Sequence, residues 1–328
     1  MHSFSLAVIV CTYDPQRYRQ LQEAIESLLH QSRKIDQLIV VVSGSEMLNQ
    51  FLASDYKRQG NVKIIYSEQS LSATQARNEG LKTVQADIIA FTDDDIVADP
   101  HWAENLLELY QNKDIIAVGG RIEPIWVDKE PDYLPDELLW LVGATHASFL
   151  TDDITEIRNT FGPNMSFRKE VFDAIGNFNE RLGFAKRGTS YIQGEEVDFG
   201  LRMIKEFGKG TYYTPRALIY HKVPASKLKF TVFMKRSFFQ GYTKAYIQRS
   251  MKHMDALSPE RSYLQRLFFS FIPEHFIRIF TSRAHIAEAK KLGVLVACLC
   301  AAGLGFIYGH LKHIRSIQQD TLHNQVQE

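Results

Sequence analysis

Cysteine is scarce in this chain of 328 residues, which contains three: Cys11, Cys298 and Cys300. Their number and spacing match neither a disulfide framework nor a cysteine-based metal site. We also expect no signal peptide, because residues 1–6 are too short and too polar for one and residues 7–11 belong to an expected strand. The sequence shows no internal repeat and no low-complexity segment. We therefore expect an ordinary globular fold in a reducing, cytosolic setting.

Net charge is missing as well, since 38 basic residues balance 38 acidic ones. The balance hides an asymmetry. Residues 221–328 hold 16 Lys and Arg against 6 Asp and Glu, which leaves 22 basic and 32 acidic residues in the first 220. A basic, aromatic-rich tail predicts an anionic partner, either nucleic acid or a membrane surface. The apolar content of the tail favours the membrane, and we expect no nucleic-acid partner.

Apolar runs alternate with amphipathic segments through the first 120 residues. The expected strands are 6–11, 37–42, 62–66, 87–91 and 115–119, and the expected helices are 16–30, 46–57, 72–84 and 101–111. This alternation predicts parallel β-α-β units and an α/β fold. Beyond residue 120 the pattern loosens. We expect irregular structure over 121–150, an extended segment at 161–167, helices at 169–175 and 195–207, and a strand at 216–223.

Three carboxylates follow directly on the strand expected at 87–91. They are Asp93, Asp94 and Asp95. Ligands bind at the carboxyl edge of an open α/β sheet, and adjacent carboxylates repel one another unless a cation lies between them. Oxygen ligands suit Mg²⁺ or Mn²⁺, which in turn bind phosphates. The pattern favours a metal–diphosphate site, and the alternative is a solvated acidic turn before the next helix.

Several further motifs accompany this triplet in a fixed order. They are Val8-Ile9-Val10-Cys11-Thr12-Tyr13, Ala76-Arg77-Asn78-Glu79-Gly80, Gly162-Pro163-Asn164-Met165-Ser166-Phe167-Arg168, Gly176-Asn177-Phe178-Asn179, and Gly194-Glu195-Glu196-Val197-Asp198 with Leu201-Arg202. Together they resemble the family 2 glycosyltransferases, which are inverting, nucleotide-sugar-dependent enzymes of the GT-A fold. The matching motifs run along about two thirds of the chain. Each motif alone is weakly specific, but their order and spacing make the resemblance strong.

The resemblance implies a donor site at the acidic triplet. Asp95 would be the chief ligand of a divalent metal, Mn²⁺ or Mg²⁺, with Asp93 beside the nucleotide and also on the metal. A metal there can stabilise the charge that builds on the leaving diphosphate. The remaining residues expected to bind the nucleotide sugar are Thr12, Tyr13, Arg77 and Asp94. For Arg77, an exposed helix position is an equally weighted alternative.

An inverting transfer needs a general base that deprotonates the acceptor hydroxyl. The family's last acid in Gly-Glu-Asp has this role, and Glu196 stands there in place of the usual Asp. We predict Glu196 as the base and Glu195 as the alternative. Both acids would also favour a helix N-terminus through its dipole.

Three more residues are candidates by resemblance. His221 ends a late strand and would be a third metal ligand, while Asn164 and Arg168 would bind the acceptor. A structural role is the alternative for each. The family's acids after the second strand are replaced by Val42-Ser43, which leaves the donor base open: UDP is the commonest in the family, and GDP or dTDP sugars are alternatives.

The C-terminal region carries a second kind of signal. Residues 292–311 contain no charged side chain and as a helix would measure about 30 Å, the thickness of a bilayer core. Small residues recur there at every fourth position, a pattern that lets membrane helices pack closely. Residues 264–280 mix aromatic and basic side chains, as an interfacial helix does. A buried helix of a soluble domain is the alternative.

From these features we expect a catalytic domain at 1–225, with a nucleotide-sugar half (1–120) and an acceptor half (121–225). A helical, basic and apolar extension at 226–328 would bind the cytoplasmic face of the membrane, peripherally or by shallow insertion. The expected function is transfer of a sugar to a glycan or lipid-linked acceptor in cell-surface polysaccharide or glycolipid assembly. The alternatives are a non-catalytic membrane-bound glycan-binding or scaffold subunit and a nucleotidyltransferase, although residues 12–15 do not form the Gly- and Lys/Arg-rich loop that a nucleotidyltransferase needs.

Overall fold

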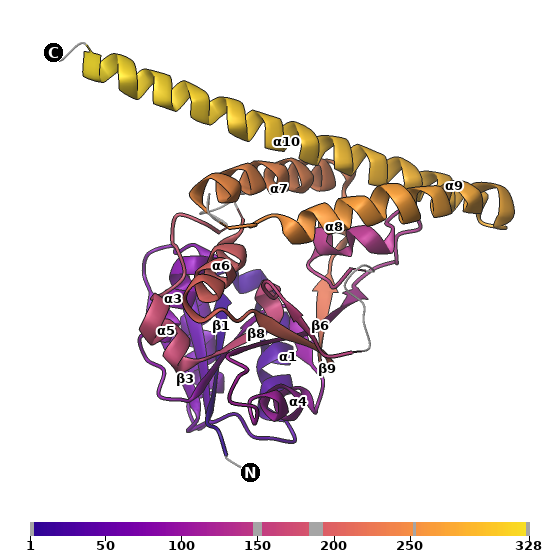
Figure 1. Cartoon of the computed structure of the whole chain (residues 1–328). Helices are drawn as coiled ribbons and strands as arrows, with labels where there is room; N and C mark the ends of the chain where they lie inside the picture. The colour runs from indigo at the N-terminus through magenta and orange to yellow at the C-terminus, as the bar shows by residue number, and fades with distance from the viewer. Residues whose placement is uncertain (1–2, 147–152, 184–192, 252–253, 326–328) are drawn as a thin grey trace.

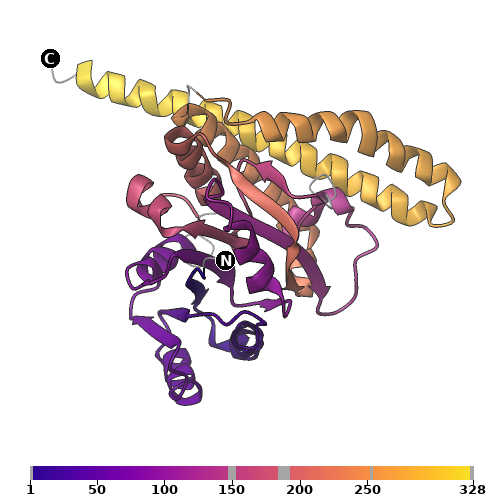
Figure 2. The same cartoon turned by 60° about the horizontal axis from the view of Figure 1, so that its bottom comes forward.

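The computed structural model describes residues 3–146, 153–183, 193–251 and 254–325, with side chains as far as residue 312. A mixed sheet lies at the centre of an α/β domain, and helices from the last third of the chain lie along one side of it (Figure 1). Figure 2 shows the same grouping after a turn of the molecule. The predicted α/β class and the helical C-terminal extension are confirmed.

Nine strands within the described residues form one sheet in the order β3-β2-β1-β4-β8-β6-β9-β5, with β7 paired to β9. The first four strands are parallel, whereas β8 runs antiparallel between β4 and β6. The strands are β1 (Leu6–Thr12), β2 (Gln37–Ser43), β3 (Val62–Ser67), β4 (Ile88–Asp93), β5 (Ile96–Ala98), β6 (Ala117–Trp126), β7 (Thr155–Ile157), β8 (Met165–Arg168) and β9 (Thr211–Val223).

Both faces of the sheet are covered by helices, which is why its strands are nearly continuous apolar runs. Along β1, Val8 packs into the core on one face and Ile9 into the core on the other, and both are fully buried. The helices of this domain are α1 (Tyr18–Leu29), α2 (Glu46–Asp55), α3 (Ala73–Leu81), α4 (Trp102–Leu109), α5 (Lys169–Ile175) and α6 (Glu195–Phe207). Helices α1 and α4 contribute to the first core, and α3, α5 and α6 to the second.

Two parts of the sheet differ from the sequence-based expectation. Strand β6 continues to Trp126, so the first residues of the segment expected to be irregular are a strand. Strand β9 begins at Thr211, five residues before its expected start, and β5 was not expected at all. Both extensions depend on pairing between distant segments, because β6 lies parallel to β9 and β5 lies antiparallel to it. The 161–167 segment is a 3₁₀ turn, η4 (Gly162–Asn164), followed by β8.

Within the described residues, the C-terminal extension contains four α-helices. They are α7 (Phe230–Ser250), α8 (Ser258–Arg266), α9 (Ile272–Thr281) and α10 (His285–Gln325), with a π-helical turn η7 (Leu267–Phe271) between α8 and α9. The expected division at residue 225 falls in the 3₁₀ turn η6 (Ala225–Leu228), between β9 and α7. Helix α10 contributes to the first core cluster of the α/β domain through Val294, Leu295 and Cys298. The extension therefore packs on the α/β domain.

The small-residue stripe of α10 holds that helix against α7. A Cβ added to Gly305 would lie 1.8 Å from the carbonyl oxygen of Phe238, and one added to Gly241 would lie 1.8 Å from that of Ala302. The two backbones thus approach too closely for larger side chains. Two ion-pair clusters also fasten the extension: in a buried one His275 lies between Glu137 and Glu288, and in a partly buried one Glu260 lies between Arg158 and Lys244.

Candidate active site

The acidic triplet lies where β4 leaves the sheet, at the carboxyl edge of the parallel strands. Asp93 is the last residue of β4, opposite Cys11 of β1. Asp94 and Asp95 form the turn into β5, and β5 pairs antiparallel with β9 so that Ile96 faces His221. This pairing brings His221 next to Asp95, with 3.2 Å between His221 Nε2 and Asp95 Oδ1.

Asp93, Asp95 and His221 form the group predicted to hold a metal. One ligand atom of each lies within 4.8 Å of the others, and Asp95 and His221 are buried. Two carboxylates and an imidazole in this arrangement fit a divalent cation. The structure thus brings together the three residues predicted as metal ligands.

Two basic side chains contact the acidic triplet, and neither was expected from the sequence. Arg17 NH2 lies 2.8 Å from Asp94 Oδ1 and also contacts Asp95. Lys227 Nζ lies 3.0 Å from Asp95 Oδ2 and 3.2 Å from His221 Nε2. Burial disfavours the charged form of Asp95, but His221, Lys227 and Arg17 outweigh it, so the pKa of Asp95 is lowered.

Asp94 has a different role from its two neighbours. It is buried, and Thr12 Oγ1 donates a 2.7 Å hydrogen bond to its Oδ2. Burial raises the pKa of Asp94 to about 7, although Arg17 acts in the opposite direction. The predicted nucleotide-binding residues Thr12 and Asp94 are therefore engaged with each other, and they fix the turn that presents Asp95. Tyr13, in contrast, is 62% exposed at the rim of the site.

Arg77 is buried on α3 and lies between the acidic triplet and the start of α6. Its NH2 is 3.7 Å from Asp93 Oδ1, and its NH1 is 3.2 Å from Glu195 Oε1 and 3.7 Å from Glu196 Oε1. The exposed position considered for this arginine is thus wrong. Burial works against the charge of Arg77, but the surrounding carboxylates outweigh it and raise its pKa. Arg77 therefore links Asp93 of the acidic triplet to the two glutamates at the start of α6.

The two acids of the predicted base motif occupy unlike environments. Glu195 is buried, bonded to Arg77 and to the backbone N–H of Gly194. The side chain of Glu196 is 20% exposed and lies farther from Arg77. Burial and the neighbouring Glu195 raise the pKa of Glu196 to about 8. Of the two acids, Glu196 is therefore the more accessible side chain and the one held less closely by Arg77.

The close packing around Glu196 explains why Gly162, in the Gly-Pro-Asn motif, has no side chain. A Cβ on Gly162 would lie 2.6 Å from Glu196 Oε1 and 2.7 Å from Arg77 NH2. The Gly-Pro-Asn turn thus lies directly against the carboxylate of Glu196. The neighbouring motifs hold the same framework together, since Asn78 donates to Phe178 O and Arg202 donates to Ile175 O.

Asn164 and Arg168 were predicted to bind the acceptor, and the structure places neither at an open surface. Asn164 is fully buried: it accepts from Trp102 Nε1 and donates to Arg121 O and Ala217 O. Its amide is fully used in joining β6, β9 and α4, which indicates a structural role.

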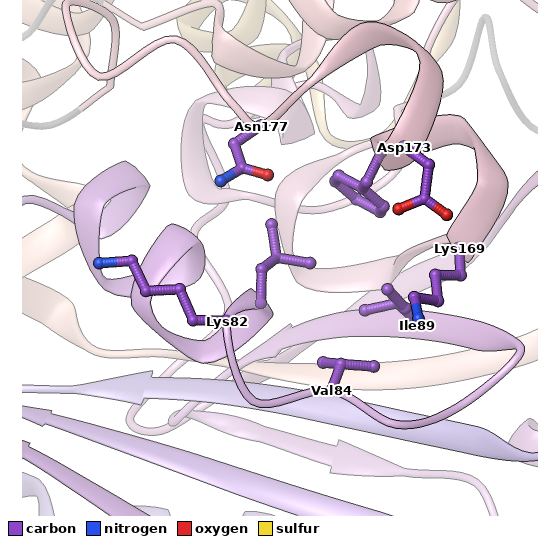
Figure 3. A pocket seen from close by; sticks show the side chains of 8 residues that line it. Lys82, Val84, Ile89, Lys169, Asp173 and Asn177 are labelled. Carbon is purple, nitrogen blue, oxygen red and sulfur yellow. The ribbon is translucent and has the colours of Figure 1, made fainter.

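Arg168 lies at the wrong edge of the sheet for acceptor binding. Because β8 runs antiparallel to β4, Arg168 faces Ile88 at the start of that strand, while the acids lie at its end. Its guanidinium donates to the carbonyl oxygens of Ile115 and Tyr110. A pocket near this end of β4, between α3 and α5, is lined by Lys82, Val84, Ile89, Lys169, Asp173 and Asn177 among others (Figure 3). It too is remote from the acidic edge.

Comparison with known proteins agrees with this geometry. The model of the family described as Glycosyl transferase family 2 matches residues 7–176. A glucosyl-dolichyl phosphate glucuronosyltransferase of Haloferax volcanii is 30% identical over 312 residues, which cover 93% of this chain and 96% of that protein. A chondroitin synthase of Escherichia coli is 23% identical over 68% of this chain and 35% of its own length. Glycosyltransferase GlyG of Streptococcus pneumoniae is 28% identical over 35% of this chain and 38% of its own length.

The chain therefore belongs to glycosyltransferase family 2, and it is a glycosyltransferase with an α/β catalytic domain of GT-A type and a helical extension. Of the three classes that the sequence left open, this one is supported by both the fold and the relatives.

Proposed function

We propose that this enzyme transfers a sugar from a nucleotide-diphosphate donor to a hydroxyl of a lipid-linked saccharide, with inversion and with a divalent metal at Asp93, Asp95 and His221. The observation that carries the proposal is Arg77. This buried side chain contacts Asp93, one of the three candidate metal ligands. It also contacts Glu196, the partly exposed candidate for the base. A donor diphosphate and an acceptor hydroxyl could therefore meet across it.

The residues at the acidic edge fit a metal–diphosphate group. Their donor atoms are two carboxylates and an imidazole within 4.8 Å, and two cations, Arg17 and Lys227, offset part of the charge of the triplet. A bound Mn²⁺ or Mg²⁺ would supply Lewis-acid stabilisation of the leaving diphosphate.

The protein's own part in the reaction is to orient the acceptor and move one proton. Glu196 takes the proton of the acceptor hydroxyl as its oxygen attacks the anomeric carbon. The bond from that carbon to the diphosphate oxygen breaks, and its electron pair leaves with the diphosphate. Arg77 holds Glu196 beside the donor cluster, because the same guanidinium contacts Glu196, Glu195 and Asp93.

The donor base is proposed as uracil, the commonest choice in the family. The structure explains the departure at Ser43: this serine is buried, and its Oγ accepts a 2.6 Å hydrogen bond from the backbone N–H of Leu71. The hydroxyl thus holds the loop after β3 against the end of β2. Groups other than an acidic side chain at this position would therefore have to recognise the nucleobase of the donor.

A membrane-held acceptor agrees with the surface of the C-terminal helices. Many large apolar side chains there are exposed: Phe268, Phe269, Phe276, Ile277, Phe280, Ile286, Leu304, Ile307, Tyr308 and Leu311. Residues 285–312 of α10 are long and apolar enough to cross a bilayer by length and composition, and most of that stretch is unburied. The relative from Haloferax volcanii is named for a dolichyl phosphate-linked substrate. We propose attachment to the cytoplasmic face through residues 262–315.

Membrane attachment through these helices predicts the effect of charge on their exposed faces. Phe269 and Phe280 are 83% and 75% exposed, so the double variant Phe269→Glu, Phe280→Glu should fold normally and lose much of its binding to anionic vesicles, because burying each charge in an interface is unfavourable. Sedimentation with vesicles measures this. Met47→Glu, at an exposed position on α2, is the control. Full-length protein that stays soluble and ignores vesicles would contradict the attachment.

The function itself is tested by a transfer assay. Purified enzyme in vesicles that contain a lipid-linked saccharide is given UDP-sugars with Mn²⁺, and the acceptor is followed by mass. The proposal expects one sugar added, and loss of the reaction when EDTA removes the metal. Transfer that continues unchanged in EDTA would refute the metal site, and transfer to free sugars alone would refute the lipid-linked acceptor.

A further inference from the structure

Lys227 lies inside the group of atoms that fits a metal ion. Its ammonium is 3.0 Å from Asp95 Oδ2 and 3.2 Å from His221 Nε2. These are donor atoms of two of the three candidate metal ligands. An ammonium and a divalent cation at this spot would compete for the same atoms.

The other cation near the triplet is held differently. Arg17 is bound to Asp94 as well as to Asp95, and Asp94 is buried and bonded to Thr12. Arg17 therefore retains a carboxylate partner if Asp95 turns to a metal, because removing it would leave Asp94 buried without its counter-ion. Among the residues that the structure describes, Lys227 has no second acid partner, since its contacts are to Asp95 and His221.

The backbone beneath Lys227 is fixed, while its side chain can turn. The η6 turn is held at both ends: Ala225 N–H donates to Asp128 Oδ2, and Tyr133 Oη donates to Leu228 O. Leu228 is buried, but the side chain of Lys227 is 26% exposed. A lysine has four flexible methylenes and can swing its charge without moving the chain.

We propose that Lys227 is a counter-ion exchanged during donor binding: in the metal-free enzyme it offsets the charge of Asp95 and contacts His221, it gives way to the metal, and it then binds the donor's diphosphate. This inference rests on the proposed function. A divalent cation that replaces the ammonium leaves one positive charge free beside it. The donor's diphosphate carries two negative charges and gains a third as its bond to the sugar breaks, while the metal's two positive charges are shared with Asp93 and Asp95. The freed lysine supplies the difference through a charge-assisted hydrogen bond.

The exchange predicts opposite effects on two affinities. In Lys227→Met, Mn²⁺ binding without nucleotide should strengthen about threefold to tenfold, because a competing cation is gone. Binding of UDP at saturating Mn²⁺ should weaken about tenfold or more, because a charged partner of the diphosphate is lost. Calorimetry on the full-length protein measures both, and Lys227→Gln serves as a second variant should the first fail to fold.

Lys229→Met is the matched control, since it removes the same charge just past the same turn at an exposed position. It should change neither affinity by more than about twofold. Unchanged Mn²⁺ and UDP binding in both Lys227 variants, or weaker Mn²⁺ binding, would overturn the exchange. Wild-type protein that binds neither Mn²⁺ nor any nucleotide would instead overturn the proposed function on which it rests.

Discussion

Glu196→Gln should lower kcat about 10²- to 10⁴-fold, the range that a general base contributes. Gln has nearly the same shape and can still face Arg77, but it cannot accept the proton of the acceptor hydroxyl. Binding of the nucleotide should remain close to that of the wild-type protein, because the donor cluster lies on the other side of Arg77. Turnover and nucleotide affinity, measured on the same samples, separate these effects.

Glu206→Gln is the control for this substitution, since Glu206 is exposed on the same helix, α6. It should leave kcat unchanged. The pH profile adds a second readout. Glu196 is active when deprotonated and its pKa is raised to about 8, so kcat/KM should rise with pH and level off above that region. Near-normal turnover by Glu196→Gln would remove Glu196 from the role of base.

Asp95→Ala should abolish metal-dependent activity and reduce Mn²⁺ affinity more than about a hundredfold, since even groups behind the ligands of a metal contribute 10- to 100-fold. Asp95 is central in the cluster: His221, Lys227 and Arg17 all contact its carboxylate. Mn²⁺ binding by electron paramagnetic resonance and activity across a metal titration check the prediction.

Folding must be verified for this variant, because three positive or titratable groups lose a partner. Asp114→Ala is a suitable control, as its side chain is 84% exposed and pairs with Lys209 away from the cluster. A stable Asp95→Ala protein that keeps wild-type Mn²⁺ affinity would show that the metal, if any, binds elsewhere.

Much of the framework could be predicted from the sequence because its signals are local. The apolar runs that become β1 and β4 end directly at Thr12 and at Asp93, so the position of the acids at the sheet edge follows from the strand boundaries. The pairing of Asp95 with His221 was expected only through family resemblance. In physical terms the contact between Asp95 and His221 depends on strand β5. This strand has three residues, too few to show a periodicity in the sequence, and it forms by pairing with β9.

The errors and omissions have a common cause in long-range geometry. Arg168 follows Asn164 closely in sequence, yet the antiparallel direction of β8 carries it to the far edge of the sheet. Arg17 and Lys227 come from segments more than 200 residues apart and meet at Asp95. Nothing in the local pattern of either segment marks it as a partner of the triplet, although a search for basic residues just past strand ends would have found Arg17.

The measurement that tests the central claim most directly is a calorimetric titration of UDP, GDP and dTDP into the wild-type protein, with and without Mn²⁺. The account predicts that UDP binds and that its binding requires Mn²⁺. Binding of another of these nucleotides in its place would keep the site and correct its base. A folded protein that binds none of the three, with or without the metal, would contradict the claim that Asp93, Asp95 and His221 form a donor site.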